Sequence, residues 1–246
     1  MKAMILAAGL GTRLRPLTND RPKALVELNG ITLIEFTIRR LAIFGIDTFF
    51  INVHHFADKV ETFLKSKNNF GYNIIISDER DGLLETGGGI KKVFTEHNLQ
   101  EDLLVYNTDI ISDLDLSQFI STHKASGADA SLSVKNRISS RYLLFDNNYD
   151  LIGWKHDAKN LYKWRKSPRE IHRTLAFSGI HIIGPHFADA FQKDDKFSII
   201  ETYLNNEELL IKGIEHRYNQ FVDAGKHKTL SEAEALMKVL EIAPYE

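Results

Sequence analysis

Hydrophobic residues in the first half of the chain form continuous runs separated by segments of helical periodicity. AMILAA (3–8), TFFINV (48–53) and EDLLVYNTD (101–109) are apolar runs that end at glycine or at polar residues. Strands buried on both faces of a parallel sheet have this pattern. LIEFTIRRLAIF (33–44) places apolar residues mostly at helical spacing before Gly45, which predicts an amphipathic helix with a glycine cap.

Strand and helix patterns alternate over this half. ADKVETFLKSK and LSQFISTHKASG have helical periodicity, YNIIISD reads as a strand, and GGGIKKVF reads as a loop that leads into a helix. Such alternation requires right-handed crossovers between parallel strands. We therefore expect an α/β fold, Rossmann-like and three-layered (α/β/α), with a mostly parallel mixed sheet.

After Gly127 the apolar segments become shorter. DASLSV, RYLLFD, DLIGW and LAFSGIHII predict strands, with DNNYD as a hairpin turn, and these indicate a small antiparallel lobe at 128–183. IIETYLNNEELLI and GKHKTLSEAEALMKVLEIA predict helices around a short strand, QFVDAG. We expect one domain over 1–246, with an N-terminal half at 1–127 and a C-terminal part at 184–246.

The composition excludes several classes of protein. The 246 residues are 43% hydrophobic and 26% charged with a net charge of -2, and cysteine is absent. These values argue against nucleic-acid or membrane partners, against disulfides and against thiolate zinc sites. Because no apolar run reaches the length of a membrane span and no secretory signal is recognisable, we expect a cytoplasmic protein.

The glycine loop after the first strand does not fit a dinucleotide-binding fingerprint. Leu14 occupies the position of the third glycine that such a site needs for its helix. Pro16 disfavours helical backbone at Arg15, so the chain after Gly11 should be looped or extended. A Walker A motif is absent as well, since the one suitable glycine spacing continues with a third glycine.

The same loop is rich in cations. Arg13, Arg15, Arg21 and Lys23 stand against a single acid, Asp20. Backbone N–H groups of a glycine loop can hold phosphate oxygens, while arginine clamps a phosphate bidentately and lysine supplies a point charge. A triphosphate site is the favoured interpretation, and a surface turn with scattered cations is the alternative.

The loop also carries a family resemblance. LAAGLGTRLRPLTNDRPKAL is similar to the GxGTRLRPLT signature, followed by KPL, of the sugar-1-phosphate nucleotidyltransferases, with Ala24 in place of the usual proline. The resemblance implies the nucleotide-diphospho-sugar transferase fold and a reaction of a nucleoside triphosphate with a sugar 1-phosphate. Catalytic roles follow for Arg13, which would stabilise departing pyrophosphate, and for Lys23, which would neutralise phosphate charge.

Fragments outside the loop resemble one branch of that family. ETGGG, NVHHFADKV and LAFSGI favour the muramate-phosphate uridylyltransferases, a branch that acts in peptidoglycan recycling, so UTP and N-acetylmuramate 1-phosphate are the favoured substrates. Mannose-1-phosphate guanylyltransferase and glucose-1-phosphate nucleotidyltransferase activities stay open. The nucleotide-binding residues implied are Ala7, Ala8, Gly9, Gly11, Thr12, Arg13, Glu85, Thr86, Gly87 and Gly88.

The three glycines of LLETGGGI allow two interpretations. Close backbone approach to a flat ligand and tight packing of a loop would both require them. We favour contact with the nucleobase, as the resemblance implies.

Two aspartates end apolar strands and are candidates for a Mg²⁺ site. Asp109 closes LLVYNTD and Asp223 closes QFVD, at the strand ends where open α/β sheets bind ligands. The resemblance assigns both as metal ligands. Asp113 and Asp115 form a D-x-D sequence, which some metal-dependent glycosyltransferases use, but they read better as the cap of the next helix.

The most basic segment lies at 155–173, with seven Lys or Arg and two acids. It is either a solvated loop or a lid that attracts an acidic acceptor. Trp154, Tyr162 and Trp164 could stack on a sugar ring or pack the lobe. The sugar-phosphate-binding residues implied by the resemblance are Asn107, Lys155, Ser178 and Gly179.

No general base or serine nucleophile is apparent, and the reaction needs neither. A phosphate monoester with a second pKa of about 6 is already largely ionised at neutral pH. Two other functions are considered: a metal-dependent glycosyltransferase using the D-x-D sequence, and a nucleotide-sensing subunit without catalysis. We expect a monomer or a homodimer.

Overall fold

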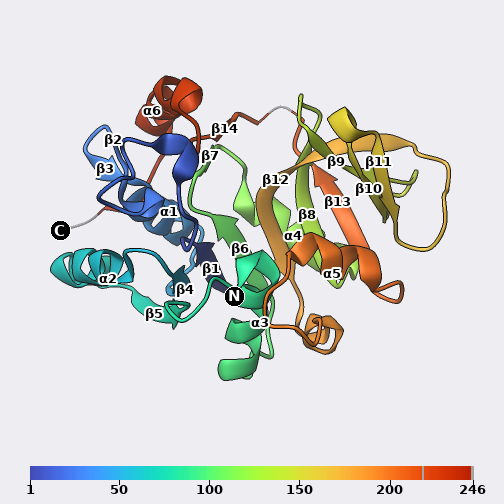
Figure 1. Ribbon diagram of the computed structural model, residues 1–246, viewed down its shortest axis with the longest axis horizontal. Coiled ribbons are helices and arrows are strands. Elements are labelled where there is room, and N and C mark those ends of the chain that lie inside the picture. The colour runs from blue at the N-terminus through green and yellow to red at the C-terminus, as the bar shows by residue number, and fades with distance from the viewer. Residues whose placement is uncertain (218, 245–246) are drawn as a thin grey trace. The chain divides into compact units, whose positions relative to one another are not determined.

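The computed structural model describes residues 1–217 and 219–244 and divides into two compact units that alternate along the chain (Figure 1). Unit 1 comprises Met1–Leu84, Val105–Asp113 and Gln220–Glu246, and unit 2 comprises Glu85–Leu104 and Leu114–Asn219. Both ends of the lobe expected at 128–183 fall inside unit 2. The last two residues of the expected C-terminal part lie outside the described residues.

Unit 1 is built on parallel strands. Its elements are β1 (Lys2–Leu6), β2 (Glu27–Leu28), β3 (Ile31–Thr32), α1 (Leu33–Ala42), β4 (Thr48–Val53), α2 (Ala57–Ser66), β5 (Asn73–Asp78), β7 (Ile110–Ser112), β14 (Phe221–Asp223) and α6 (Leu230–Val239). The strand β6 (Leu103–Asn107) ends in this unit. The strand order is β6-β1-β4-β5, with β1 parallel to β4 and β4 parallel to β5. The predicted α/β class is confirmed.

The apolar runs form the buried strands that their pattern predicts. Ala3, Met4 and Ile5 in β1 have no exposed surface, and Phe49 and Ile51 of β4 are equally buried. Burying such side chains contributes on the order of 25 cal/mol per Å² of apolar surface. This sheet fixes the points at which β1, β4 and β6 end, and the loops that follow carry the candidate site.

Helix α1 begins at Leu33, as predicted, and ends at Ala42, two residues before the predicted end. Thr32 Oγ1 accepts a hydrogen bond from the Glu35 N–H at 3.2 Å, which caps the first turn. Gly45 follows the last turn at φ +80°, a conformation that favours glycine. The buried face of α1 includes Leu33 and Phe36.

A second core of unit 1 lies behind a short antiparallel ribbon of β7 and β14. The ribbon pairs Asp223 with Ile110 and Val222 with Ile111. The cluster of buried side chains around it is Leu14, Val26, Leu28, Leu33, Phe36, Ile111, Val222, Ala224, Ala233, Leu236 and Met237. This cluster joins the glycine loop, α1 and α6, so the segments that carry the cations and the aspartates share one packed support.

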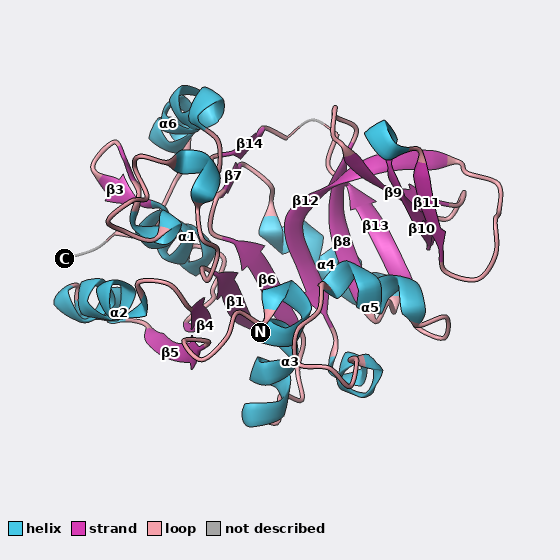
Figure 2. Ribbon diagram, viewed as in Figure 1, coloured by secondary structure: helices cyan, strands magenta, loops and turns pink. Residues whose placement is uncertain are grey.

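Unit 2 contains a mixed sheet (Figure 2). Its elements are α3 (Glu85–Glu96), α4 (Leu116–Ser126), β8 (Ala130–Lys135), β9 (Arg141–Phe145), β10 (Leu151–His156), β11 (Leu161–Trp164), β12 (Arg173–Ile183), α5 (Ile199–Asn205) and β13 (Ile211–Glu215). The strand order is β11-β10-β9-β12-β8-β13, antiparallel except for the parallel pair β8 and β13. The antiparallel strands predicted after Gly127 are confirmed.

Two predictions of local structure in unit 2 are wrong. The helix expected over IIETYLNNEELLI ends at Asn205, and its last residue instead starts β13, because Ile211 pairs with Ala130 in the sheet. The segment GGGIKKVF is not a loop before a helix, since α3 begins at Glu85 and includes all three glycines. In both cases contacts within the unit outweigh local propensity.

Among the described residues, no helix has the length and apolar character that a membrane span requires.

Candidate active site

The glycine loop of unit 1 is a rigid turn that Lys23 crosses. Gly11 has φ +63°, and a Cβ there would meet Lys23 Cβ and Thr18 Cγ2 at 3.0 Å each. Thr18 Oγ1 donates to the Gly11 carbonyl at 2.8 Å. Both the backbone conformation and the lack of space therefore require glycine at this position.

The chain after Gly11 avoids an α-helix, as predicted from Pro16. A single 3-10 turn spans Thr12–Leu14, and Arg15 leaves it with extended backbone, φ -59° and ψ 137°. Arg13 stands on this turn with 57% of its side chain exposed. An arginine so exposed can reach a ligand without first losing a strong protein contact.

Lys23 and Asp109 form the most buried ion pair of the candidate residues. Lys23 Nζ lies 2.7 Å from Asp109 Oδ2, with 14% and 7% of the two side chains exposed. Gly9 lies beside the same ammonium, 3.8 Å from Nζ to its ideal Cβ position. The predicted catalytic lysine and the predicted metal ligand thus lie in direct contact next to the glycine loop.

Asp223 reaches the same place through β14. Its neighbour Gly225 has no room for a side chain, because a Cβ would lie 2.5 Å from Asp109 Oδ2, 2.9 Å from Asp223 Oδ1 and 3.0 Å from an Arg13 Nη. The Ala224 N–H donates to the Asp109 carbonyl at 2.8 Å, which fixes the two backbones together. Both aspartates and the arginine therefore converge on one point beside Gly225.

Cations around Asp223 favour its ionised form. Burial alone would raise the pKa of Asp223, but a hydrogen bond from Lys226 Nζ at 2.8 Å and one from the Gly225 N–H at 2.9 Å outweigh it. The charge of Arg13, 3.8 Å away, adds to this effect. The pKa of Asp223 is therefore below its usual value, and the carboxylate is charged at neutral pH.

The two aspartates fit a Mg²⁺ ion. Within residues 1–217 and 219–244, no group of three or more acidic or histidine side chains could hold a metal by itself. Mg²⁺ in phosphate-transferring sites needs only one or two carboxylates, since waters and substrate phosphates complete its octahedron. Asp109 and Asp223 supply that pair of carboxylates, with Lys23 and Lys226 as their present partners.

A buried polar pair, which the sequence analysis did not single out, supports the loop from below. Asn52 Oδ1 accepts from the N–H of Ala7 at 2.7 Å and of Ala8 at 3.3 Å, and Asn52 Nδ2 donates to Glu79 Oε1 at 2.8 Å. Glu79 Oε2 accepts from the Leu84 N–H at 3.1 Å. Asn52 and Glu79 are 3% and 2% exposed. The sequence held one sign of this pair: Asn52 is the only amide in the apolar run TFFINV, and a buried amide requires hydrogen-bond partners.

The hydrogen bonds to Asn52 determine which backbone groups of Ala7 and Ala8 a ligand can use. Their N–H groups donate to Asn52, so their carbonyls are the backbone groups left for a ligand. Thr108 stands where the resembled family has glycine, and its Oγ1 donates to the Leu6 carbonyl at 2.8 Å. Asn107, just before it, is the last residue of β6.

In unit 2 the first of the three glycines, Gly87, packs against Phe197. A Cβ on Gly87 would lie 2.3 Å from ring carbons of Phe197, and the Gly87 N–H donates to the Phe197 carbonyl at 2.9 Å. Thr86 Oγ1 accepts from the Ile199 N–H at 3.1 Å. Of the two interpretations of these glycines, ligand contact or tight packing, the structure has tight packing at Gly87. Glu85 precedes it with φ +61°.

The basic segment begins as an ordered hairpin. β10 and β11 pair antiparallel, and Lys155 lies opposite Tyr162. Lys155 Nζ binds Asp157 Oδ1 at 2.8 Å, and this contact raises the pKa of the lysine. The rings of Tyr162 and Trp164 stack with centroids 6.0 Å apart.

Ser178 and Gly179 lie at an irregularity of β12. The register against β8 shifts between Phe177 and His181, and Gly179 has φ +73° there. The buried Ser178 Oγ hydrogen-bonds His216 Nε2 at 2.7 Å. Glycine suits the positive φ at this irregularity, and an irregularity of this kind bends the strand.

The D-x-D sequence serves structural roles. Asp115 caps α4 by accepting from the Gln118 N–H at 3.0 Å, as predicted. Asp113 Oδ1 accepts from the Gln220 N–H at 2.7 Å. Neither carboxylate belongs to the group formed by Asp109 and Asp223.

Comparisons with known proteins identify the family of the chain. Residues 2–142 match the sequence profile of the nucleotidyl transferase family. An N-acetylmuramate alpha-1-phosphate uridylyltransferase from Caulobacter vibrioides is 58% identical over 91 residues, 36% of this chain and 38% of that protein. A UTP--glucose-1-phosphate uridylyltransferase from Synechocystis is 29% identical over 213 residues, 81% of this chain and 53% of that protein. The matched part of the chain thus spans about half, or less, of these relatives.

Solved structures share the fold at low sequence identity. HddC from Yersinia pseudotuberculosis has a TM-score of 0.76 at 22% identity, covering 95% of this chain and 98% of that one. The inositol-1-phosphate CTP transferase from T. maritima has a TM-score of 0.74 at 18% identity, covering 96% and 94%. The predicted Rossmann-like fold is confirmed by these likenesses. With its profile match over more than half of its length, the chain belongs to the nucleotidyl transferase family.

Proposed function

We propose that the chain transfers a nucleotidyl group from a nucleoside triphosphate to a sugar 1-phosphate. An oxygen of the sugar phosphate attacks the α-phosphorus, the bond to the β-phosphate oxygen breaks, and a nucleotide sugar and pyrophosphate leave. The convergence of Lys23, Asp109, Asp223 and Arg13 beside the glycine loop carries this proposal. Two carboxylates and two cations in one place suit the charge of reacting phosphates.

Each residue of this group has a distinct task. Lys23 neutralises charge on the α-phosphate or on the incoming phosphate, and Arg13, which is exposed, clamps the departing pyrophosphate. Asp109 and Asp223 would hold Mg²⁺, which when bound supplies charge neutralisation to the phosphates. The nucleophile is a phosphate with a second pKa of about 6, so no side chain has to remove a proton.

The remaining assignments complete the substrate sites. The loop residues Gly9, Gly11 and Thr12, with the carbonyls of Ala7 and Ala8, would face the nucleotide. Glu85, Thr86 and Gly88 would contact it from the start of α3. The sugar phosphate would be held by Asn107, Lys155, Ser178 and Gly179.

UTP and N-acetylmuramate 1-phosphate are our preferred substrates, which would give the chain a role in peptidoglycan recycling. The relative from Caulobacter vibrioides supports this choice. The relative from Synechocystis supports glucose 1-phosphate as the alternative acceptor. We further propose a cytoplasmic monomer or homodimer.

The test is a matrix of ATP, CTP, GTP and UTP against the 1-phosphates of N-acetylmuramate, glucose and mannose, with Mg²⁺ present. Formation of the nucleotide sugar is followed by chromatography. We expect product with UTP and N-acetylmuramate 1-phosphate. Product with another pair only would correct the substrates, and no product from folded protein with any pair would refute the reaction.

Two variants separate this reaction from the glycosyltransferase alternative. Asp223→Asn should abolish turnover, because it removes a carboxylate of the converging group. Asp115→Asn should leave turnover unchanged, since asparagine caps a helix as well as aspartate does. The opposite result would favour the D-x-D sequence as the metal site.

A further inference from the structure

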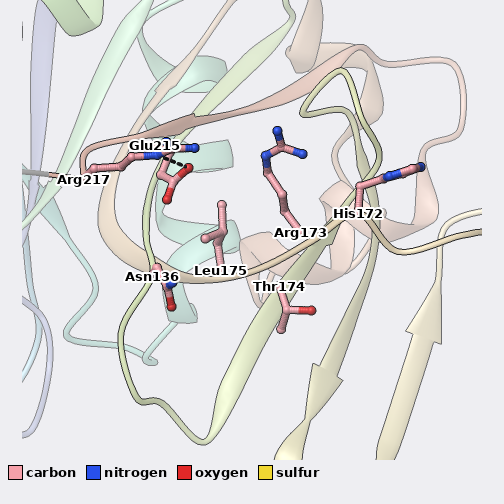
Figure 3. A pocket seen from close by; sticks show the side chains of 7 residues that line it. All are labelled: Asn136, His172, Arg173, Thr174, Leu175, Glu215 and Arg217. Carbon is pink, nitrogen blue, oxygen red and sulfur yellow. Dashed lines mark hydrogen bonds and ion pairs between the residues drawn. The ribbon is translucent and has the colours of Figure 1, made fainter.

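Unit 2 contains a pocket whose lining includes none of the residues assigned above to the proposed reaction. It has a volume of about 760 Å³ and is lined by Asn136, His172, Arg173, Thr174, Leu175, Glu215 and Arg217 (Figure 3). This volume lies in the range of small-molecule sites, roughly 300 to 1,000 Å³. The lining residues come from the end of β8, the start of β12 and the end of β13, three strands of one sheet.

The one acid of the pocket is already satisfied. Glu215 has 9% of its side chain exposed, and its Oε2 accepts from Arg217 Nε at 3.0 Å and from Tyr149 Oη at 2.8 Å. Arg217 also donates from an Nη to Tyr149 Oη at 3.3 Å. Glu215 is therefore matched by Arg217, and the pocket retains the charge of its second arginine.

That second arginine, Arg173, is paired with no acceptor among residues 1–217 and 219–244. Its guanidinium forms no hydrogen bond or ion pair with any residue in the described part of the chain, and it lies over the ring of Tyr149, 4.3 Å from the ring centroid. Figure 3 shows Arg173 between Glu215 and His172, with no dashed line to either. A guanidinium has five N–H donors in a planar fork that matches a carboxylate or a phosphate.

The ring of Tyr149 lies under the Arg173 guanidinium, and the backbone of Tyr149 is held by several hydrogen bonds. It has φ +62°, which is uncommon for an aromatic residue, in the turn Asp146–Asp150. Asp146 Oδ1 accepts from the N–H groups of Asn148 and Asp150 at 2.9 and 3.0 Å. The Gly213 N–H donates to the Tyr149 carbonyl at 2.9 Å, which ties the turn to β13. These contacts hold Tyr149, and with it the ring under Arg173, in one conformation.

We propose that this pocket binds the oxyanion of a small molecule, a carboxylate or a phosphate, on Arg173. The anion would accept two parallel hydrogen bonds from the guanidinium, whose other face lies on Tyr149. Arg217 stays paired with Glu215, so Arg173 supplies the charge for the anion, and the buried Leu175 would form the apolar floor. This inference does not depend on the proposed reaction.

The test is an NMR titration of the full-length chain, which reads the Nε–Hε signals of its arginines. Inorganic phosphate and acetate are added separately at constant ionic strength, with chloride as the reference. We expect the Arg173 signal to shift and saturate with at least one probe. The phosphate and acetate arms then show which oxyanion the pocket prefers.

Variants assign the response to the pocket. Arg173→Gln should weaken binding by about tenfold or more, and Arg173→Lys by less, because lysine keeps the charge but loses the fork. Arg169→Gln is the matched control and should bind as the unmodified chain does. If Arg173→Gln does not fold, as judged by circular dichroism, Arg173→Lys carries the comparison.

Two results would overturn the proposal. One is an Arg173 signal that responds to phosphate and acetate only as it does to chloride. The other is unchanged affinity in a folded Arg173 variant. Because binding is read without turnover, either result leaves the nucleotidyl transfer proposal unaffected.

Discussion

Lys23 Nζ lies 2.7 Å from Asp109 Oδ2, although 86 positions separate the two residues along the chain. The pair is largely buried, so each charge stabilises the other where water cannot. Lys23 therefore has a structural role in addition to the catalytic one proposed for it. The two roles can be separated by experiment.

Replacing Lys23 with alanine should lower both stability and turnover. The unpaired Asp109 carboxylate should cost on the order of 1 to 3 kcal/mol in the free energy of unfolding. The double variant Lys23→Ala/Asp109→Asn should recover much of that stability, because it removes the unpaired charge, but no activity. Urea unfolding and a pyrophosphate-release assay measure the two quantities. Recovery of turnover in the double variant would show that neither charge takes part in the reaction.

Gly225 offers a test of the converging carboxylates. Gly225→Ala adds a methyl group 2.5 Å from Asp109 Oδ2 and 2.9 Å from Asp223 Oδ1, so at least one carboxylate must move. We expect a loss of about 10² in kcat, since displaced catalytic groups act poorly even in a folded enzyme. Gly82→Ala is the control, because its Cβ meets nothing within 4 Å. Equal activity of both variants would argue against a site beside Gly225.

Asn52 should support nucleotide binding, because it holds the backbone of Ala7 and Ala8 at the start of the glycine loop. Asn52→Ala leaves the N–H groups of Ala7 and Ala8 and one oxygen of Glu79 without their partner. The expected cost is about 1 to 3 kcal/mol of stability, together with a higher KM for the triphosphate. A change in stability with an unchanged KM would limit Asn52 to a structural role.

Acid should destabilise unit 2 through His181. Burial lowers the pKa of His181 to about 3, against about 6.5 in the unfolded chain, and its Nδ1 hydrogen-bonds Tyr203 Oη. Between these pH values only the unfolded chain binds the proton. Stability should therefore fall as the pH falls below about 6.5, by roughly 1.4 kcal/mol per pH unit from this group.

The variant His181→Gln isolates that contribution. Glutamine can still hydrogen-bond Tyr203 but does not titrate, so its stability should depend less steeply on pH in the same range. Denaturant unfolding at a series of pH values gives the two slopes. Identical slopes would mean that His181 takes up its proton in the folded state as well.

Local signals in the sequence were sufficient for β1, β4, β5, α1 and α2 of unit 1 and for assigning Lys23 and Asp109 to the same site. Apolar runs predict buried strands, and a strand end predicts where Asp109 lies. The loop backbone was also predictable, because Pro16 restricts Arg15 in any fold.

What the sequence did not reveal depends on contacts between distant segments. β7 has three residues and exists only because β14 pairs with it, and this ribbon brings Asp223 next to Asp109. The glycines of α3 read as a loop, since glycine disfavours helices, but Gly87 needs its small size to pack on Phe197. Tyr149 and Arg173 carry no motif, and they meet only through the sheet of unit 2.

The most direct test of the central claim is the stoichiometry of products from one triphosphate and one sugar 1-phosphate with Mg²⁺. We predict that UTP and N-acetylmuramate 1-phosphate yield UDP-N-acetylmuramate and pyrophosphate in equal amounts, and that omission of either substrate stops both products. A glycosyltransferase would instead consume a nucleotide sugar and release a nucleoside diphosphate. Binding of triphosphate without pyrophosphate release, for every sugar 1-phosphate supplied, would contradict the account.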